Sequence, residues 1–158
     1  MSLHIVLHEP EIPANTGNIA RTSAGTGTFL HLIHPLGFST EDRMLKRAGC
    51  DYWPHVLIKH HESLDAFLAD KKRENLYFVE TTGSMPYSSC DYRDVTQDYY
   101  FIFGKETKGL PANIAKAYPE RCIRLPQNDQ VRSLNLSNAV AVVVYEALQQ
   151  QSFPGLRY

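Results

Sequence analysis

The sequence predicts an α/β protein with a parallel sheet and helices on both faces. Short, nearly unbroken apolar runs recur along the 158 residues, which is typical of strands that are buried on both sides. Segments with helical character separate these runs, and alternating strands and helices favour a parallel sheet. The length fits one domain over residues 1–158, at about 100–200 residues per domain.

Six apolar runs are interpreted as strands, because each is short and rich in aliphatic and aromatic residues: Leu3–His8, Phe29–His34, Val56–Lys59, Leu76–Glu80, Tyr99–Phe103 and Cys122–Leu125. Five segments are predicted to be helical: Gly17–Ala24, Thr40–Ala48, Ser63–Asp70, Pro111–Ala117 and Asn135–Gln150. A proline suits the first turn of the fourth helix. Residues 83–94 form a long polar connection.

The last predicted helix is apolar on nearly all sides. One face carries apolar residues at helical spacing: Leu136, Val140, Val143, Val144, Ala147 and Leu148. Ala141, Val142 and Tyr145 make the opposite side apolar as well. Such a helix needs cover on both sides. We therefore expect a homodimer built on this helix, and a fully internal helix is the alternative.

Composition limits the possible partners and the compartment. The formal net charge is −1, so a nucleic-acid site must be a local patch. Three widely spaced cysteines indicate reduced thiols. The N-terminus has no signal-peptide pattern, and residues 139–145 are far shorter than the ~18 residues of a membrane span. We expect a cytoplasmic protein that does not enter a membrane.

Several common motifs are absent from the sequence. The P-loop, the G-x-G-x-x-G dinucleotide motif and the G-x-S-x-G nucleophile motif do not occur. His31 and His34 are an odd number of residues apart on a predicted strand and so face opposite sides, which is a poor arrangement for a metal. We expect no metal, and a nucleotide-like cofactor would need another kind of site.

Residues 9–21, the first segment, follow the first strand. Two prolines extend this connection, and Asn15 or Thr16 can cap the following helix. The loop is therefore predicted at the carboxyl edge of the sheet, where α/β proteins bind ligands. Asn18 and Arg21 are three residues apart and share a helix face. A capped helix with a surface arginine remains the alternative.

Two further segments follow buried strands. The second segment, residues 103–111, places Gly104 and Gly109 around a charged turn, so that its backbone can approach a ligand closely; a plain connecting loop is the alternative. The third segment, residues 123–141, crowds polar side chains at the start of an apolar helix: Ser133, Asn135, Ser137 and Asn138. One of them could be the N-cap, but a cap does not need four.

A basic helix face is predicted within residues 40–48. Arg43, Lys46 and Arg47 recur at helical spacing, so they could contact RNA phosphates or form a solvated face.

Together the three segments resemble the three motifs of the SPOUT superfamily of RNA methyltransferases, and most closely its small members that methylate tRNA at nucleotide 34. The resemblance runs from Leu3 to about Gly155 and includes I-V-L-H-E-P-E-I-P, N-T-G-N-I-A-R, H-P-L-G-F, G-x-E-T-K-G-L-P and S-L-N-L-S-N-A-V. It implies a parallel-sheet α/β-knot fold with a deep C-terminal trefoil knot, which periodicity does not show. It also implies a homodimer that transfers the methyl group of S-adenosylmethionine to a ribose 2′-hydroxyl in the tRNA anticodon stem-loop. The target is the wobble nucleotide, position 34, as cytidine or modified uridine.

Matching positions carry the family's functional residues over. The catalytic set implied by the resemblance is Arg21, Asn15, Glu106, Ser133 and Asn135. The cofactor set, acting largely through the backbone, is Glu80, Thr81, Thr82, Gly104, Ile123, Leu125, Ser133 and Leu134. The implied RNA contacts are Tyr145 and the basic face of Arg43, Lys46 and Arg47. His8, where relatives often carry tyrosine, and Val131 depart from the pattern.

Arg21 is the resemblance's candidate for handling the ribose hydroxyl. Because arginine stays protonated at neutral pH, orienting the hydroxyl and the adjacent phosphate is favoured over acting as a base. Two alternatives remain open, a non-catalytic RNA-binding module and a 2′-O-methyltransferase that acts on a different tRNA or rRNA nucleotide. Gly104, Glu106 and Gly109 together argue against the binding module.

Overall fold

The computed structural model describes residues 2–39, 41, 43, 47 and 52–157. In this part of the chain a seven-stranded sheet has the order β3-β2-β1-β6-β4-β7-β5, and every neighbouring pair of strands is parallel. The strands are β1 (Leu3–His8), β2 (Phe29–Ile33), β3 (Leu57–His61), β4 (Leu76–Val79), β5 (Met85–Pro86), β6 (Tyr99–Phe103) and β7 (Cys122–Arg124).

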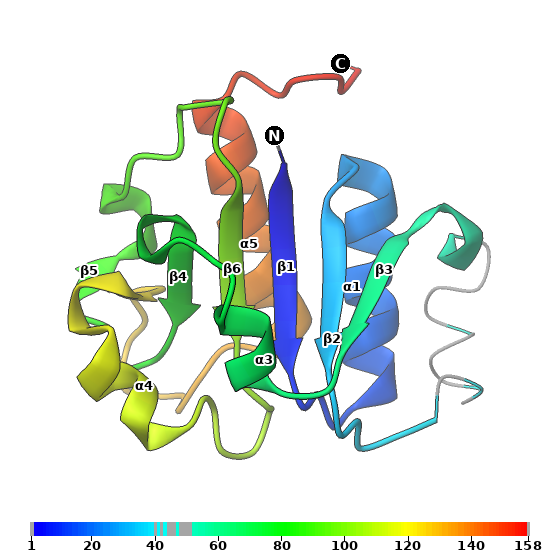
Figure 1. Ribbon diagram of the computed structural model, residues 1–158, viewed down its shortest axis with the longest axis horizontal. Helices are drawn as coiled ribbons and strands as arrows, with labels where there is room; N and C mark the ends of the chain where they lie inside the picture. Colours follow the sequence, from blue (N-terminus) through cyan, green and yellow to red (C-terminus); the bar gives the residue numbers. More distant parts are fainter. Residues whose placement is uncertain (1, 40, 42, 44–46, 48–51, 158) are drawn as a thin grey trace.

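Helices cover both faces of this sheet, as the sequence predicted. The α-helices with described bounds are α1 (Pro13–Thr26), α3 (Leu64–Leu68), α4 (Ala112–Ala117) and α5 (Leu136–Gln150). Helices α1 and α5 pack side by side on one face, and α3 and α4 cover the other (Figure 1). Short 3-10 turns occur at Trp53–His55, Arg73–Asn75, Tyr87–Ser89 and Pro119–Arg121. The α/β prediction is confirmed.

Helix α1 begins four residues before the predicted start at Gly17. The extended Ile12 is its N-cap, and Pro13 occupies the first turn, where a missing N–H costs nothing. The helix ends where Gly27 adopts the left-handed conformation at φ 69°, as helix C-termini commonly do. Pro13 therefore belongs to the first turn of this helix, and only Pro10 lies in the loop before it.

Within the described residues, the other predicted elements agree with the structure except in one connection. The polar connection at residues 83–94 contains β5 and a 3-10 turn. Among the described residues, strand β5 pairs with β7 alone. It has two residues, which is too few to leave a periodic signal in the sequence. The helix predicted at Thr40–Ala48 falls mostly outside the described residues.

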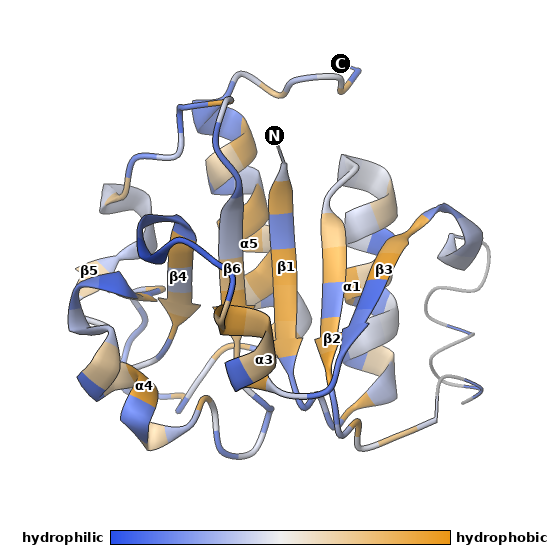
Figure 2. Cartoon of the chain, viewed as in Figure 1, coloured by the Kyte–Doolittle hydropathy of each residue, from blue (hydrophilic) through white to orange (hydrophobic). Residues whose placement is uncertain are grey.

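The central strands are buried on both faces, which explains their largely apolar pattern. In Figure 2 orange dominates β1 and β2, and a hydrophilic band interrupts each of them. In β1, Leu3, Ile5 and Leu7 pack in the cluster that includes α1 and α5, whereas Val6 packs in the cluster that includes α3 and α4. This alternation follows from the two-residue period of a strand.

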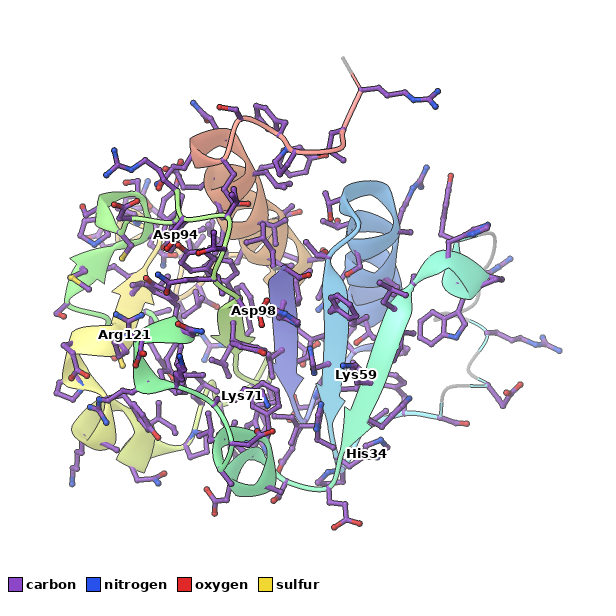
Figure 3. The ribbon with its side chains drawn as sticks, turned by 45° about the horizontal axis from the view of Figure 1, so that its top comes forward. His34, Lys59, Lys71, Asp94, Asp98 and Arg121 are labelled. Atoms are coloured by element: carbon purple, nitrogen blue, oxygen red, sulfur yellow. The ribbon has the colours of Figure 1, made fainter. Side chains whose placement is uncertain are left out.

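Three histidines form a row across the face that α3 covers. His4 Nδ1 lies 3.0 Å from His31 Nε2, and His31 Nδ1 lies 2.8 Å from His61 Nε2. Asp98 Oδ1 is 3.6 Å from His4 Nε2, and Lys59 and Lys71, labelled with Asp98 in Figure 3, raise the positive potential here. The row is thus a continuous chain of imidazoles that runs from β1 through β2 to β3.

Burial keeps this histidine row neutral. Desolvation lowers the pKa of His4 to about 4 and the pKa of His31 to about 3, with the neighbouring lysines adding to both shifts. Because the folded chain resists protonation and the unfolded chain does not, the unfolded state binds more protons below pH 6.5. The contribution of His4 and His31 to the free energy of unfolding is therefore fully present above pH 6.5, and it is lost as the pH falls toward 4.

Acidification from pH 7 to pH 5 is expected to lower the free energy of unfolding by about 2 kcal/mol for each of these two imidazoles. Urea unfolding at both pH values measures the difference. His31→Gln, which keeps one donor and one acceptor, should flatten the dependence, whereas a change at the exposed His34 should not. Equal free energies of unfolding at pH 7 and pH 5 would contradict this assignment.

Helix α5 is buried along one side only. Val140, Val143, Val144, Ala147 and Leu148 pack into the core, while Val142 remains 40% exposed and Tyr145 50% exposed. The alternative of a fully internal helix is therefore wrong for this chain. None of the described helices is long and apolar enough to cross a membrane.

Candidate functional site

A cavity of about 490 Å³ opens at the carboxyl edge of the sheet, within the ~300–1,000 Å³ range of small-molecule sites. The loops after β1, β4, β6 and β7 surround it, as expected for a parallel sheet. In the view of Figure 1 this edge is at the bottom of the sheet. The lining residues are Ile12, Asn15, Val79, Glu80, Thr81, Phe103, Gly104, Lys105, Glu106, Thr107, Lys108, Gly109, Leu125, Gln127, Arg132, Ser133, Leu134, Asn135, Leu136 and Ala139.

The Glu106 carboxylate joins the second segment to the first. Its Oε2 accepts a hydrogen bond from the backbone N–H of Glu11 at 2.9 Å. Its Oε1 accepts from the backbone N–H of Ile12 at 3.1 Å and from Asn15 Nδ2 at 3.3 Å. Both oxygens are thus engaged by the loop before α1, so the geometry gives Glu106 a positioning role.

Asn15 extends this connection to the third segment. Asn135 Nδ2 donates to Asn15 Oδ1 at 3.0 Å. Asn135 Oδ1 accepts from the backbone N–H groups of Ser137 and Asn138 and so caps α5. We call Glu106, Asn15 and Asn135 the carboxylate–amide network. It links all three segments at the cavity wall.

Two more contacts hold the first and second segments together. Lys105 Nζ lies 2.5 Å from Glu9 Oε2, and Thr107 Oγ1 donates to Glu11 Oε1 at 2.9 Å. The hydrogen bond from Lys105 lowers the pKa of Glu9, and the same contact raises the pKa of Lys105. These pairs leave Lys105 engaged with its own chain.

The sequence suggested that Gly104 lacks a side chain so that a ligand can approach the backbone. In the structure, the protein's own backbone occupies that space. A Cβ at Gly104 would lie 2.0 Å from the carbonyl carbon of Gly109 and 2.2 Å from Leu110 N. At Gly83, a Cβ would lie 2.6 Å from the carbonyl carbon and oxygen of Ile123. Both glycines are required because neighbouring backbone leaves no room for a Cβ, so a larger side chain at Gly104 would disturb the fold as well as any ligand.

Most of the predicted site residues meet at this cavity. Asn15, Glu106, Ser133 and Asn135 of the catalytic set line it, as do Glu80, Thr81, Gly104, Leu125 and Leu134 of the cofactor set. Thr82 and Ile123 do not line the cavity. Ile123 is fully buried in β7, where its carbonyl accepts from Glu80 N at 2.9 Å.

Arg21 is the catalytic candidate that lies outside the cavity lining. Its guanidinium carbon is 4.9 Å from the centroid of the Tyr52 ring, and Nη2 is 3.4 Å from the Tyr52 hydroxyl. The side chain is exposed, which leaves it accessible to a polyanion. Sequence reasoning missed Tyr52, because the contact joins residues 31 positions apart.

The predicted RNA-contacting residues that the structure describes do not line the cavity. Tyr145 is exposed on α5. Arg43 and Arg47 are exposed as well, whereas Lys46 lies outside the described residues. No group of three or more His, Cys, Asp or Glu side chains suited to holding a metal ion occurs among the described residues.

Fold and site together define a class of protein: a parallel α/β protein whose ligand cavity is built from loops at the carboxyl edge and closed by contacts between those loops. Residues 2–145 match the SpoU rRNA Methylase family. The chain belongs to this family.

Individual proteins similar to this chain are more specific than the family as a whole. The chain is 54% identical over 157 residues to a Bacillus subtilis (strain 168) protein named "Putative tRNA (cytidine(34)-2'-O)-methyltransferase", covering 99% of this chain and 98% of that one. It is 48% identical over 154 residues to the Escherichia coli (strain K12) tRNA (cytidine(34)-2′-O)-methyltransferase, covering 97% and 96%. A solved structure described as "Structural insights into the 2-OH methylation of C/U34 on tRNA" has a TM-score of 0.87 at 43% identity, covering 96% and 97%.

Proposed function

We propose that the protein transfers the methyl group of S-adenosylmethionine to the ribose 2′-hydroxyl of nucleotide 34 of tRNA, in the cytoplasm, where it meets that substrate. The relatives named above support the reaction and the substrate. The observation that carries the proposal is the carboxylate–amide network, because it assembles the three motif segments around one cavity of cofactor size.

The residues of the cavity fit this cofactor. Apolar side chains of Val79, Phe103 and Leu125 offer a surface for a purine, and the loop at residues 104–109 exposes backbone groups to it. The carboxylate of Glu80 on the wall can accept hydrogen bonds from a ligand. When bound, S-adenosylmethionine supplies a methyl group that is open to nucleophilic attack.

The protein's own contribution is mainly positioning. Holding the two reactants in line can supply several kcal/mol of a displacement barrier. The network fixes the loops, and Ser133 and the backbone of Leu134 lie on the wall they shape. A ribose hydroxyl is a poor nucleophile at neutral pH, so a side chain must polarise it. Arg21 takes this role by orienting the hydroxyl and the adjacent phosphate.

Membership of the family implies the trefoil knot. The close approach of backbone at Gly83 supports it, since a Cβ there would lie 2.6 Å from the carbonyl carbon of Ile123 in β7. Gly83 follows β4, and the loops after β4 and β7 both surround the cavity, so the knot and the cofactor site are proposed to be one structure.

The reaction is tested with the full chain, S-adenosylmethionine and unmodified tRNA. Nucleoside mass spectrometry after digestion should detect a 2′-O-methylnucleoside, and fragment mapping should place it at position 34. Methylation at another tRNA position or only in rRNA would contradict the proposed target. No methylation together with no binding of S-adenosylhomocysteine would contradict the enzyme itself.

We further propose that two copies associate through α5. Val142 and Tyr145 are exposed apolar and aromatic side chains on this helix, next to α1. Exposed apolar faces of this kind commonly mark interfaces, and a two-fold dimer presents the same face from both copies.

Val142→Glu is expected to raise the dissociation constant of this dimer at least about 100-fold, because the interface would bury an unpaired charge. Sedimentation at micromolar concentration measures it. Val95→Glu, the same change at a valine that is 53% exposed and lies outside α5, is the matched control. A monomeric unmodified chain at that concentration would contradict the dimer.

A further inference from the structure

In the part of the chain that the structure describes, one oxygen of the Glu80 carboxylate, Oε2, has no hydrogen-bond partner, and Glu80 lines the cavity. Glu80 directly follows β4, and its Oε1 accepts a hydrogen bond from the backbone N–H of Leu110 at 3.1 Å. This single bond fixes the side chain against the second segment. Among the described residues, Glu80 forms no ion pair with any lysine, arginine or histidine.

Burial disfavours the charged form of Glu80 when no ligand is bound. The side chain is half-buried, and desolvation raises the pKa of its carboxyl group. A carboxylate removed from water is stabilised by hydrogen-bond donors or a cation, yet the wall supplies one backbone N–H. A perturbed carboxyl group in a cavity is typical of a ligand-binding position.

Gly109 keeps the approach to the carboxylate open. Its φ of 68° favours glycine, and a Cβ there would lie 3.6 Å from Glu80 Oε2. Because Gly109 has no side chain, nothing at this position covers the second carboxylate oxygen, and both residues line the cavity.

The distribution of charge indicates which part of a cofactor reaches Glu80. Lys108 and Arg132 are the exposed cations of the lining, so a carboxylate at the amino-acid end of a ligand would meet them at the open side. With the ligand's carboxylate at the exposed cations, a neutral hydrogen-bond donor of the ligand would meet the half-buried Glu80. A ribose diol presents two hydroxyl donors, and in dinucleotide-binding folds an acidic side chain near a strand end holds a ribose in this way.

We infer that Glu80 Oε2 accepts a hydrogen bond from the ribose diol of the adenosine moiety of S-adenosylmethionine. The inference rests on the proposed function, since it assumes that cofactor. It assigns to the side chain of Glu80 a specific contact, beyond a role for the backbone at this position. It also explains why a carboxylate without a cation is kept at the wall.

Calorimetry on the full chain tests the contact with three ligands: S-adenosylhomocysteine and its 2′-deoxy and 3′-deoxy analogues. The unmodified chain should prefer the parent ligand over at least one analogue by about tenfold, the ratio that corresponds to 1.4 kcal/mol. Glu80→Gln keeps an acceptor for the N–H of Leu110 but removes the charge. It should bind the parent ligand about tenfold more weakly and lose most of that preference.

A control variant and two further outcomes distinguish a specific contact with the diol from a general effect on the loop and from a wrong cofactor assignment. Glu62→Gln removes an equivalent charge at an exposed position after β3 and should bind all three ligands like the unmodified chain. If Glu80→Gln weakens all three ligands by the same factor, or none, the diol contact is wrong. An unmodified chain that binds S-adenosylhomocysteine without preferring either hydroxyl overturns this inference alone, whereas one that does not bind it overturns the proposed function too.

Discussion

Arg21→Ala is expected to lower methyl transfer to tRNA by about 10²–10³-fold, the range typical for removing one donor that stabilises charge in a transition state. The guanidinium is exposed and held by Tyr52 through its ring face and hydroxyl. This contact holds an exposed cation in place, which fits the proposed role of orienting a substrate phosphate and hydroxyl. Nucleoside mass spectrometry of tRNA treated with each variant gives the rate.

The companion substitutions make this prediction specific. Arg21→Lys should be nearly as damaging, because an ammonium lacks the planar fork that binds two acceptors at once. Affinity for S-adenosylhomocysteine should change less than about twofold, since Arg21 lies outside the cavity lining. Arg93→Ala, which removes an exposed arginine paired with Asp91, is the matched control.

Two outcomes would contradict the role of Arg21. Near-normal 2′-O-methylnucleoside from Arg21→Ala would remove the residue from the mechanism. Loss of cofactor binding with the same variant would show that its contribution is to the structure of the site rather than to the substrate.

The fold was predictable because strands that are buried on both faces have apolar residues at nearly every position of the sequence. Runs such as Tyr99–Phe103 are apolar at every position since the strand is covered on both faces. Strand β5 shows no such run, because two residues cannot form a periodic pattern. The early start of α1 was also missed, because Pro13 serves a loop and a first helical turn equally well.

The site was predictable in its segments but not in its contacts. The polar residues after each strand indicated which loops meet, whereas the partners of Glu106 are 91 to 95 positions away. A single sequence gives no information on such pairs. For the same reason Gly104 suggested a bound ligand, although the atoms closest to it belong to its own loop.

Glu106→Ala is expected to separate the three segments. The substitution removes the acceptor of two backbone N–H groups and of the Asn15 amide, and Asn15 in turn holds Asn135. Hydrogen bonds to a charged acceptor contribute more than neutral ones, so losing this group should lower the free energy of unfolding by about 2–3 kcal/mol. Cofactor affinity should fall at least about 30-fold, because the loops that line the cavity lose their common anchor.

Glu106→Gln distinguishes anchoring from acid–base chemistry. A glutamine retains one oxygen acceptor for the N–H groups of Glu11 or Ile12, so it should restore part of the stability and of the cofactor affinity, with methyl transfer recovering in proportion. Urea unfolding, calorimetry with S-adenosylhomocysteine and the tRNA assay measure the three quantities, and Glu120→Gln, which removes an exposed carboxylate paired with Arg73, is the control. If Glu106→Gln folds and binds cofactor normally but does not methylate, the carboxylate acts on the substrate, and the anchoring role assigned to it here is wrong.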